Sequence, residues 1–153
     1  MNLTIPKSEL SRGLYITQSI VEKRTTMPIL VNILLTASNG GLTLWATDLE
    51  ITAVSRLNAA VKSRGSTTIN AKVFGDIVKE LPEGDIKLEV TEGERLEISA
   101  GKSKFKGIGT SAEEYPGLPG INMEVQGKMK TAQFLEMINK TIYAVSHDET
   151  RYN

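Results

Sequence analysis

Apolar residues recur at two spacings along this chain, and each spacing predicts a different kind of element. A short alternating run at residues 2–6 predicts a strand that ends at Pro6. A helix should follow, with Ser8 as its N-cap. The residues expected on its buried face lie three or four positions apart, namely Leu10, Leu14, Thr17 and Val21.

Two more helices are predicted from the same spacing. The helix at 71–82 has Asn70 as a suitable N-cap, and Pro82 and Gly84 end it. The helix at 131–146 follows a strand predicted at 123–130. The residues expected on the buried faces are Val73, Ile77 and Leu81 in the first of these helices and Phe134, Ile138 and Val145 in the second.

Runs of β-prone residues, separated by turn residues, predict a sheet around the first two helices. The segment 38–41 contains Asn39-Gly40, which is typical of a hairpin turn, and the polar segment 62–66 is expected to be a loop. The predicted strands are 29–37, 42–47, 50–57, 66–70, 85–90, 95–100 and 102–109.

The segment 113–120 is rich in proline and glycine and predicts a domain boundary. A first domain is therefore expected at 1–120 and the start of a second at 121–153. A strand followed by a helix opens both, and their apolar positions correspond at a constant offset, as in tandem domains. The sequence predicts an α+β domain with two helices packed on antiparallel sheet, plus the first strand and helix of a similar domain. The incomplete second unit indicates a fragment of a longer protein.

Composition narrows the chemistry that the chain can perform. It has 18 basic and 18 acidic residues, so binding to nucleic acid through total charge is not expected. The absence of cysteine excludes disulfides and thiolate metal sites. His147 is the only histidine and lacks a partner for a metal site or a nucleophilic pair. The N-terminus does not have the pattern of a signal peptide, and no apolar run is long enough for a membrane span, so a cytoplasmic protein is expected.

Two groups of charged residues remain as candidates. The cations opposite the predicted buried helix faces are Lys7, Arg12, Lys72 and Lys79. They could contact phosphates without reading bases, or they could simply form a solvated helix surface. Asp48 and Glu50 could hold a metal ion in an α+β enzyme, although the polar ends of a hairpin turn explain them equally well.

Several short motifs occur in a characteristic order over the whole chain. They are Arg24, Met27-Pro28-Ile29-Leu30, Asn32-Ile33-Leu34-Leu35, Thr47-Asp48-Leu49-Glu50, Leu81-Pro82-Glu83-Gly84, the segment from Ser99 to Phe105, Glu114-Tyr115-Pro116, and the segment from His147 to Tyr152. In this order and at these spacings, the chain resembles the bacterial DNA sliding clamps, the beta subunits of DNA polymerase III.

The resemblance implies a function without catalysis and without a cofactor. Members of the family have three similar domains, and two copies join head to tail into a ring whose helices line a hole for double-stranded DNA. The ring acts as a processivity factor in the bacterial cytoplasm, at the nucleoid. Its other partners are the polymerase III catalytic subunit and the clamp loader, which dock on regions mostly beyond this chain. A truncated, clamp-like binding module that does not encircle DNA is the alternative.

The resemblance also implies roles for individual residues. Arg24, Lys72 and Tyr152 match positions that lie near DNA, to which the helix cations Lys7, Arg12 and Lys79 are added. Lys102, Lys104, Phe105 and Arg95 match the subunit interface. Three residues depart from the family pattern, namely Gly107 at the interface and Asp148 and Asn153 in the last segment.

Overall fold

The computed structural model describes residues 1–21, 27–117 and 127–145. The chain divides into two compact units, Met1–Leu118 and Pro119–Asn153. Each unit is described by itself.

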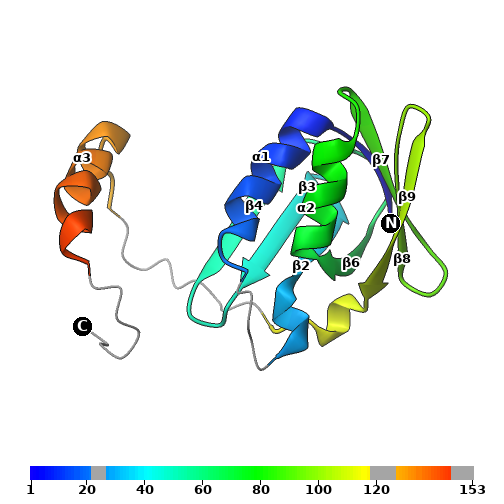
Figure 1. The fold of residues 1–153 in the computed structure, drawn as a ribbon, viewed down its shortest axis with the longest axis horizontal. Coiled ribbons are helices and arrows are strands. Elements are labelled where there is room, and N and C mark those ends of the chain that lie inside the picture. Colours follow the sequence, from blue (N-terminus) through cyan, green and yellow to red (C-terminus); the bar gives the residue numbers. More distant parts are fainter. Residues whose placement is uncertain (22–26, 118–126, 146–153) are drawn as a thin grey trace. The chain divides into compact units, whose positions relative to one another are not determined.

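The first unit consists of two helices and a nine-stranded antiparallel sheet (Figure 1). The helices are α1 (Lys7–Gln18) and α2 (Ala71–Glu80). The strands are β1 (Asn2–Pro6), β2 (Asn32–Ser38), β3 (Gly41–Thr47), β4 (Thr52–Leu57), β5 (Ala60–Ser63), β6 (Gly65–Asn70), β7 (Asp85–Thr91), β8 (Arg95–Ala100) and β9 (Ser103–Thr110). Their order in the sheet is β4-β3-β2-β6-β9-β8-β7-β1-β5.

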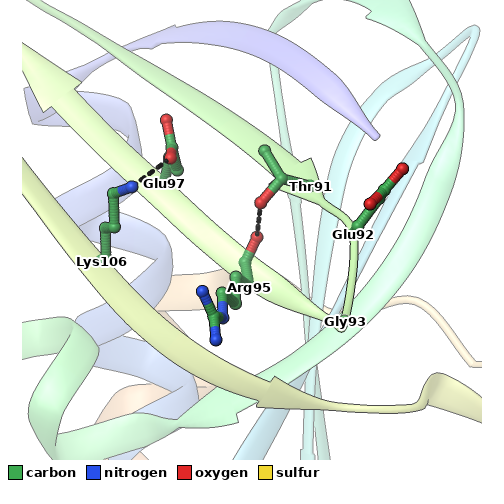
Figure 2. A pocket seen from close by; sticks show the side chains of 6 residues that line it. All are labelled: Thr91, Glu92, Gly93, Arg95, Glu97 and Lys106. Atoms are coloured by element: carbon green, nitrogen blue, oxygen red, sulfur yellow. Dashed lines mark hydrogen bonds and ion pairs between the residues drawn. The ribbon is translucent and has the colours of Figure 1, made fainter.

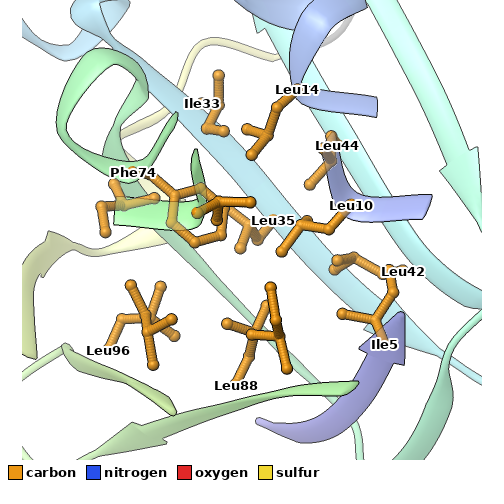
Figure 3. Packing of buried hydrophobic residues seen from close by; sticks show 14 of the residues in the cluster. Ile5, Leu10, Leu14, Ile33, Leu35, Leu42, Leu44, Phe74, Leu88 and Leu96 are labelled. Atoms are coloured by element: carbon orange, nitrogen blue, oxygen red, sulfur yellow. The ribbon is translucent and has the colours of Figure 1, made fainter. Parts of the chain in front are cut away.

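The core lies between the helices and one face of the sheet. Figure 1 shows α1 and α2 side by side over this face, and Figure 3 shows Leu10 and Leu14 of α1 and Phe74 of α2 packed with strand residues. The strands alternate between buried and more exposed positions, as β2 does with Ile33 and Leu35 inward. Burying one such leucine or isoleucine side chain contributes about 1.5–3 kcal/mol, so this face fixes the position of both helices.

Helix α1 confirms most of the predicted buried face but not the predicted cap, and Val21 is only partly buried because the helix ends before it, at Gln18. Leu10, Leu14 and Thr17 are buried. The helix begins at Lys7, one residue before Ser8, and no side chain caps it. The Lys7 N–H instead donates to the carbonyl of Gly84 at 2.8 Å, so a neighbouring turn satisfies one of the free donors at this helix end.

Helix α2 confirms the predicted N-cap, because the Asn70 side chain accepts a hydrogen bond from Val73 N at 3.0 Å. The predicted buried face is partly wrong, since Val73 is 50% exposed. Phe74 and Val78 are buried in its place. The core-facing stripe of α2 runs through Phe74 and Val78, which leaves Val73 on its flank, and Leu81 is buried just beyond the end of the helix.

Two stretches between the helices differ from the predicted strands. Residues Pro28–Val31 form the 3-10 helix η1, so β2 begins at Asn32 rather than at residue 29. The expected loop at 62–66 contains the end of β5 and the start of β6. Strand β5 lacks the alternation of apolar residues that would predict a strand. It is a strand because it pairs with β1, where Leu3 lies opposite Val61.

The 3-10 helix η2 (Ala112–Glu114) follows β9 and leads to Tyr115, which is buried. The Tyr115 hydroxyl donates to the carbonyl of Asn32 at 3.4 Å, and burial raises the pKa of this side chain. These contacts fix the end of the first unit to β2.

The described part of the second unit contains helix α3 (Thr131–Thr141) and the 3-10 helix η3 (Ile142–Ala144). The predicted buried residues are exposed here, with Phe134 at 52%, Ile138 at 37% and Val145 at 59%. No described strand of this unit covers them. Residues 127–130 are not a strand, and the rest of the strand predicted at 123–130 lies outside the described residues.

Candidate functional site

The two helices present cations on the face that points away from the sheet. Lys72 and Lys79 of α2 are exposed, and neither forms an ion pair or side-chain hydrogen bond within the described residues. Their ammonium groups are therefore available to an anionic ligand. They are two of the helix cations that the sequence predicted.

Lys7 is placed differently from the other predicted helix cations. Its side chain is only 14% exposed, and its Nζ donates to the carbonyls of Leu81 at 2.6 Å and Lys79 at 3.2 Å. It also pairs with Glu83 at 3.0 Å. A cation at this place satisfies carbonyls at the C-terminal end of α2 and complements the helix dipole. Lys7 is thus engaged in holding α2 against α1.

Arg12 is exposed but paired. Its Nη2 donates to Glu9 Oε2 at 3.0 Å, one turn back on α1. This hydrogen bond lowers the pKa of Glu9 below its ordinary value, so the carboxylate keeps its charge to lower pH than an unpaired glutamate would. The pair reduces the net charge that Arg12 offers to a ligand.

The two helices are held together at their other ends by Gln18. Its Nε2 donates to the carbonyl of Ala71 at 2.6 Å, and Gly75 leaves the space that this side chain occupies. A Cβ at Gly75 would lie 1.9 Å from Gln18 Nε2. This contact, with that of Lys7 at the opposite end, sets the position of Lys72 and Lys79 relative to α1.

Arg24 and Tyr152, both predicted near DNA, lie outside the described residues, as do His147, Asp148 and Asn153. Their roles remain predictions. The helix surface does contain an aromatic residue that the sequence analysis did not single out, because Tyr15 on α1 is 83% exposed.

The carboxylates considered as a metal site have a structural role. Asp48 Oδ1 accepts hydrogen bonds from Glu50 N at 2.9 Å and Ile51 N at 2.6 Å, which closes the turn between β3 and β4. Leu49 within this turn has a φ of 81°. In the described parts of the chain, no three histidine, cysteine or acidic side chains lie close enough to bind a metal ion.

The predicted interface residues gather on β8 and β9. Strand β9 pairs with β8 along most of its length, whereas it pairs with β6 only at Gly109 and Thr110. Lys104 is exposed and Phe105 is 38% exposed. Lys102 lies in the turn before β9 and is also exposed. Within the described residues, β9 thus has one side with little strand pairing, in agreement with the predicted edge strand, and the interface roles of these residues stay a prediction.

Arg95 lies at the start of β8, beside an open depression of about 600 Å³ (Figure 2). The residues around it are Thr91, Glu92, Gly93, Arg95, Glu97 and Lys106. Lys106 Nζ pairs with Glu97 Oε1 at 2.9 Å, and Thr91 Oγ1 donates to the Arg95 carbonyl at 3.3 Å. The Arg95 guanidinium has no ion pair within the described residues, so its charge is open to a partner.

Sequence analysis missed one residue of this edge. Ile108 pairs in register with Arg95 and is 86% exposed, more than any other isoleucine or leucine in the described residues. Ile108 follows Lys104 and Lys106 at a spacing of two residues, which places all three side chains on one face of the strand. This spacing was the sequence signal that could have identified Ile108 as exposed.

The fold is similar to that of solved sliding clamps. The DNA polymerase sliding clamp from Bacillus subtilis matches with a TM-score of 0.92 at 32% identity, over 99% of this chain and 42% of that chain. Caulobacter crescentus pol III beta matches with a TM-score of 0.92 at 36% identity, over the same shares of the two chains. The fold therefore defines the class as a sliding clamp.

Sequence relatives lead to a particular family within this class. The beta sliding clamps of Chlamydia pneumoniae and Caulobacter vibrioides are 31% and 36% identical to the chain and match 99% of it. The chain spans 42% and 41% of their lengths. The family model of the DNA polymerase III beta subunit, N-terminal domain, matches residues 1–119, and the chain belongs to this family.

None of the helices in the described residues is both long and apolar enough to cross a membrane.

Proposed function

We propose that the chain is the first part of a sliding clamp that encircles duplex DNA and tethers the replicative DNA polymerase. Its role is that of a processivity factor and not of an enzyme. The observation that carries the proposal is family membership over residues 1–119 combined with free lysines on the helix face opposite the sheet. We also propose that it acts in the bacterial cytoplasm, at the nucleoid.

Lys72 and Lys79 are the described residues that best fit contact with DNA. Both are exposed and unpaired, whereas Lys7 caps α2 and Arg12 is bound to Glu9. Arg24 and Tyr152 are added from the resemblance. Lysine contacts to phosphates carry no base specificity, and the contacts exchange readily with counterions, which suits a protein that slides.

The complete protein is proposed to close into a ring through the open edge of β9. In this arrangement Lys102, Lys104, Phe105 and Arg95 contact the third domain of a second copy, head to tail. The polymerase catalytic subunit and the clamp loader bind elsewhere on the complete protein. Free cations at the edge support the assignment, since an interface needs a partner of complementary charge.

The test is a titration of fluorescent duplexes of unrelated sequence at two low salt concentrations. We expect weak binding that is equal for all sequences. Changing both Lys72 and Lys79 to alanine should reduce the slope of log affinity against log salt by about 0.9 for each lost phosphate contact. Lys62→Ala, an exposed lysine on β5, is the matched control and should leave the slope unchanged. A marked preference for one duplex would refute the proposal, because a sliding protein cannot favour one site.

A further inference from the structure

Asn39 and Gly40 form the turn between β2 and β3, which pair next to it through Ser38↔Gly41. This is the only Asn-Gly sequence in the chain, and both residues are exposed. Gly41 holds the turn close to the end of β4, since it has a φ of 112° and a Cβ there would lie 2.2 Å from the Leu57 carbonyl oxygen. A turn with a fixed base therefore presents Asn39 and Gly40 to solvent.

The side chain of Asn39 is bound to a cation. Arg64 lies between β5 and β6, and its Nε donates to Asn39 Oδ1 at 2.8 Å. A guanidinium at this oxygen draws electron density from Asn39 Cγ. It also stabilises the negative charge that develops on Oδ1 when a nucleophile adds to Cγ. Arg64 thus makes this amide more reactive than an asparagine side chain that faces only water.

The nucleophile that the chain itself supplies is the backbone nitrogen of Gly40. Its attack on the Cγ of the preceding residue closes a five-membered ring. Glycine has no Cβ to hinder this approach, and its backbone adopts many conformations. A Cβ at Gly40 would meet only Ser38 Oγ, at 3.9 Å, so the space beside the nitrogen is open.

We propose that Asn39 is a site of spontaneous deamidation, which Gly40 carries out and Arg64 promotes. The Gly40 nitrogen loses its proton to water and bonds to Asn39 Cγ. The bond from Cγ to Nδ2 then breaks, and ammonia leaves with a proton from solvent. Water opens the resulting succinimide at either carbonyl, which gives aspartate or isoaspartate without any change of oxidation state. Each product places a carboxylate in the turn, where Arg64 can pair with it.

The proposal is tested by incubating the 153-residue chain at mildly alkaline pH and following its tryptic peptides by mass spectrometry. Conversion adds about 1 Da, because a carboxylic acid replaces an amide. We expect this gain in the peptide 25–56, and fragmentation should place it at Asn39 and not at Asn32. Asn58 is the internal control, since it is exposed but followed by alanine, and it should stay unchanged over the same time.

Two variants test the roles of the neighbouring residues. Gly40→Ala fits the open space and should slow the reaction by about tenfold or more, because a Cβ hinders closure of the ring. Arg64→Ala should slow it by about fivefold, the effect of one exposed hydrogen bond from a charged donor. Lys62→Ala is the matched control for Arg64→Ala, since it removes an exposed cation two residues earlier, and it should leave the rate unchanged.

Three results would overturn the proposal. They are an unchanged mass at Asn39, conversion of Asn58 at the same rate, and a rate in Arg64→Ala that equals or exceeds that of the parent chain. The proposal is independent of the clamp function, because neither Asn39 nor Arg64 belongs to the helix surface on which the duplex titration depends.

Discussion

Single residues decide whether the two halves of the sheet stay joined. Gly109 donates from its N–H to the carbonyl of Glu94 at 2.9 Å, at the place where β9 meets β6. A Cβ at this position would lie 2.6 Å from that carbonyl oxygen and 2.7 Å from the carbonyl oxygen of Thr68. Both neighbours are backbone atoms, one in the tight turn before β8 and one in β6, so they cannot move aside as the end of a side chain could.

Gly109→Ala should therefore lower the free energy of unfolding by about 1–3 kcal/mol, the usual cost of overpacking. Urea denaturation followed by circular dichroism measures this. Gly117→Ala is the control, because no atom lies within 4 Å of a Cβ placed there, and it should stay within about 0.5 kcal/mol of the parent. Equal stability of the two variants would mean that the junction of β6 and β9 is not close-packed.

Among the helices, Lys7 joins the start of α1 to the end of α2. We expect this lysine to affect the stability of the fold but not the binding of DNA. Lys7→Met keeps the length of the side chain and removes the ammonium group from the carbonyls of Leu81 and Lys79. We expect it to lower the free energy of unfolding by about 1–3 kcal/mol, since these acceptors lose a charged donor. The ion pair with Glu83, whose own side chain is 82% exposed, should contribute little to this value.

Lys79→Met is the reciprocal change. It removes an exposed lysine, so stability should change little while duplex affinity at low salt falls. Lys7→Met should do the opposite. The assignment of the two lysines would be wrong if Lys7→Met reduced duplex affinity at full stability, measured by urea denaturation and duplex titration on the same samples.

The parts of the fold that the sequence could predict are those set by local spacing. Leu10 and Leu14 on α1 and the Asn70 cap of α2 follow from helical period and capping chemistry. Val73 was misplaced because the pattern alone does not distinguish an apolar residue on the flank of a helix from one in the core. Strand β5 was missed because only its long-range pairing with β1 makes it a strand.

The residues of the candidate site likewise fall into those that the sequence could predict and those that depend on long-range contacts. Lys72 and Lys79 could be predicted as exposed helix cations, and the resemblance supplied Lys104 and Phe105. The hydrogen bonds of Lys7 could not be predicted, because their acceptors are carbonyls more than seventy residues away in the chain. The exposure of Ile108 depends on where β6 ends, which is likewise a tertiary feature.

At the scale of the whole molecule, the proposed function depends on enclosure and not on tight contact. The described residues offer only two free lysines on the helix face, and a few phosphate contacts give weak, salt-sensitive binding. On the proposed function, we expect the complete protein to stay on DNA only when the DNA passes through a closed ring. Retention should therefore depend on whether the DNA has ends.

The most direct measurement uses the complete gene product that carries this chain, loaded by its clamp loader onto a nicked circular plasmid. Gel filtration at physiological salt then separates bound from free protein before and after one restriction cut. We expect the protein to elute with the circular plasmid and to leave the linear one, since it can slide off an end. Equal retention on circular and linear DNA, or none on either, would contradict the account that this protein holds DNA by encircling it.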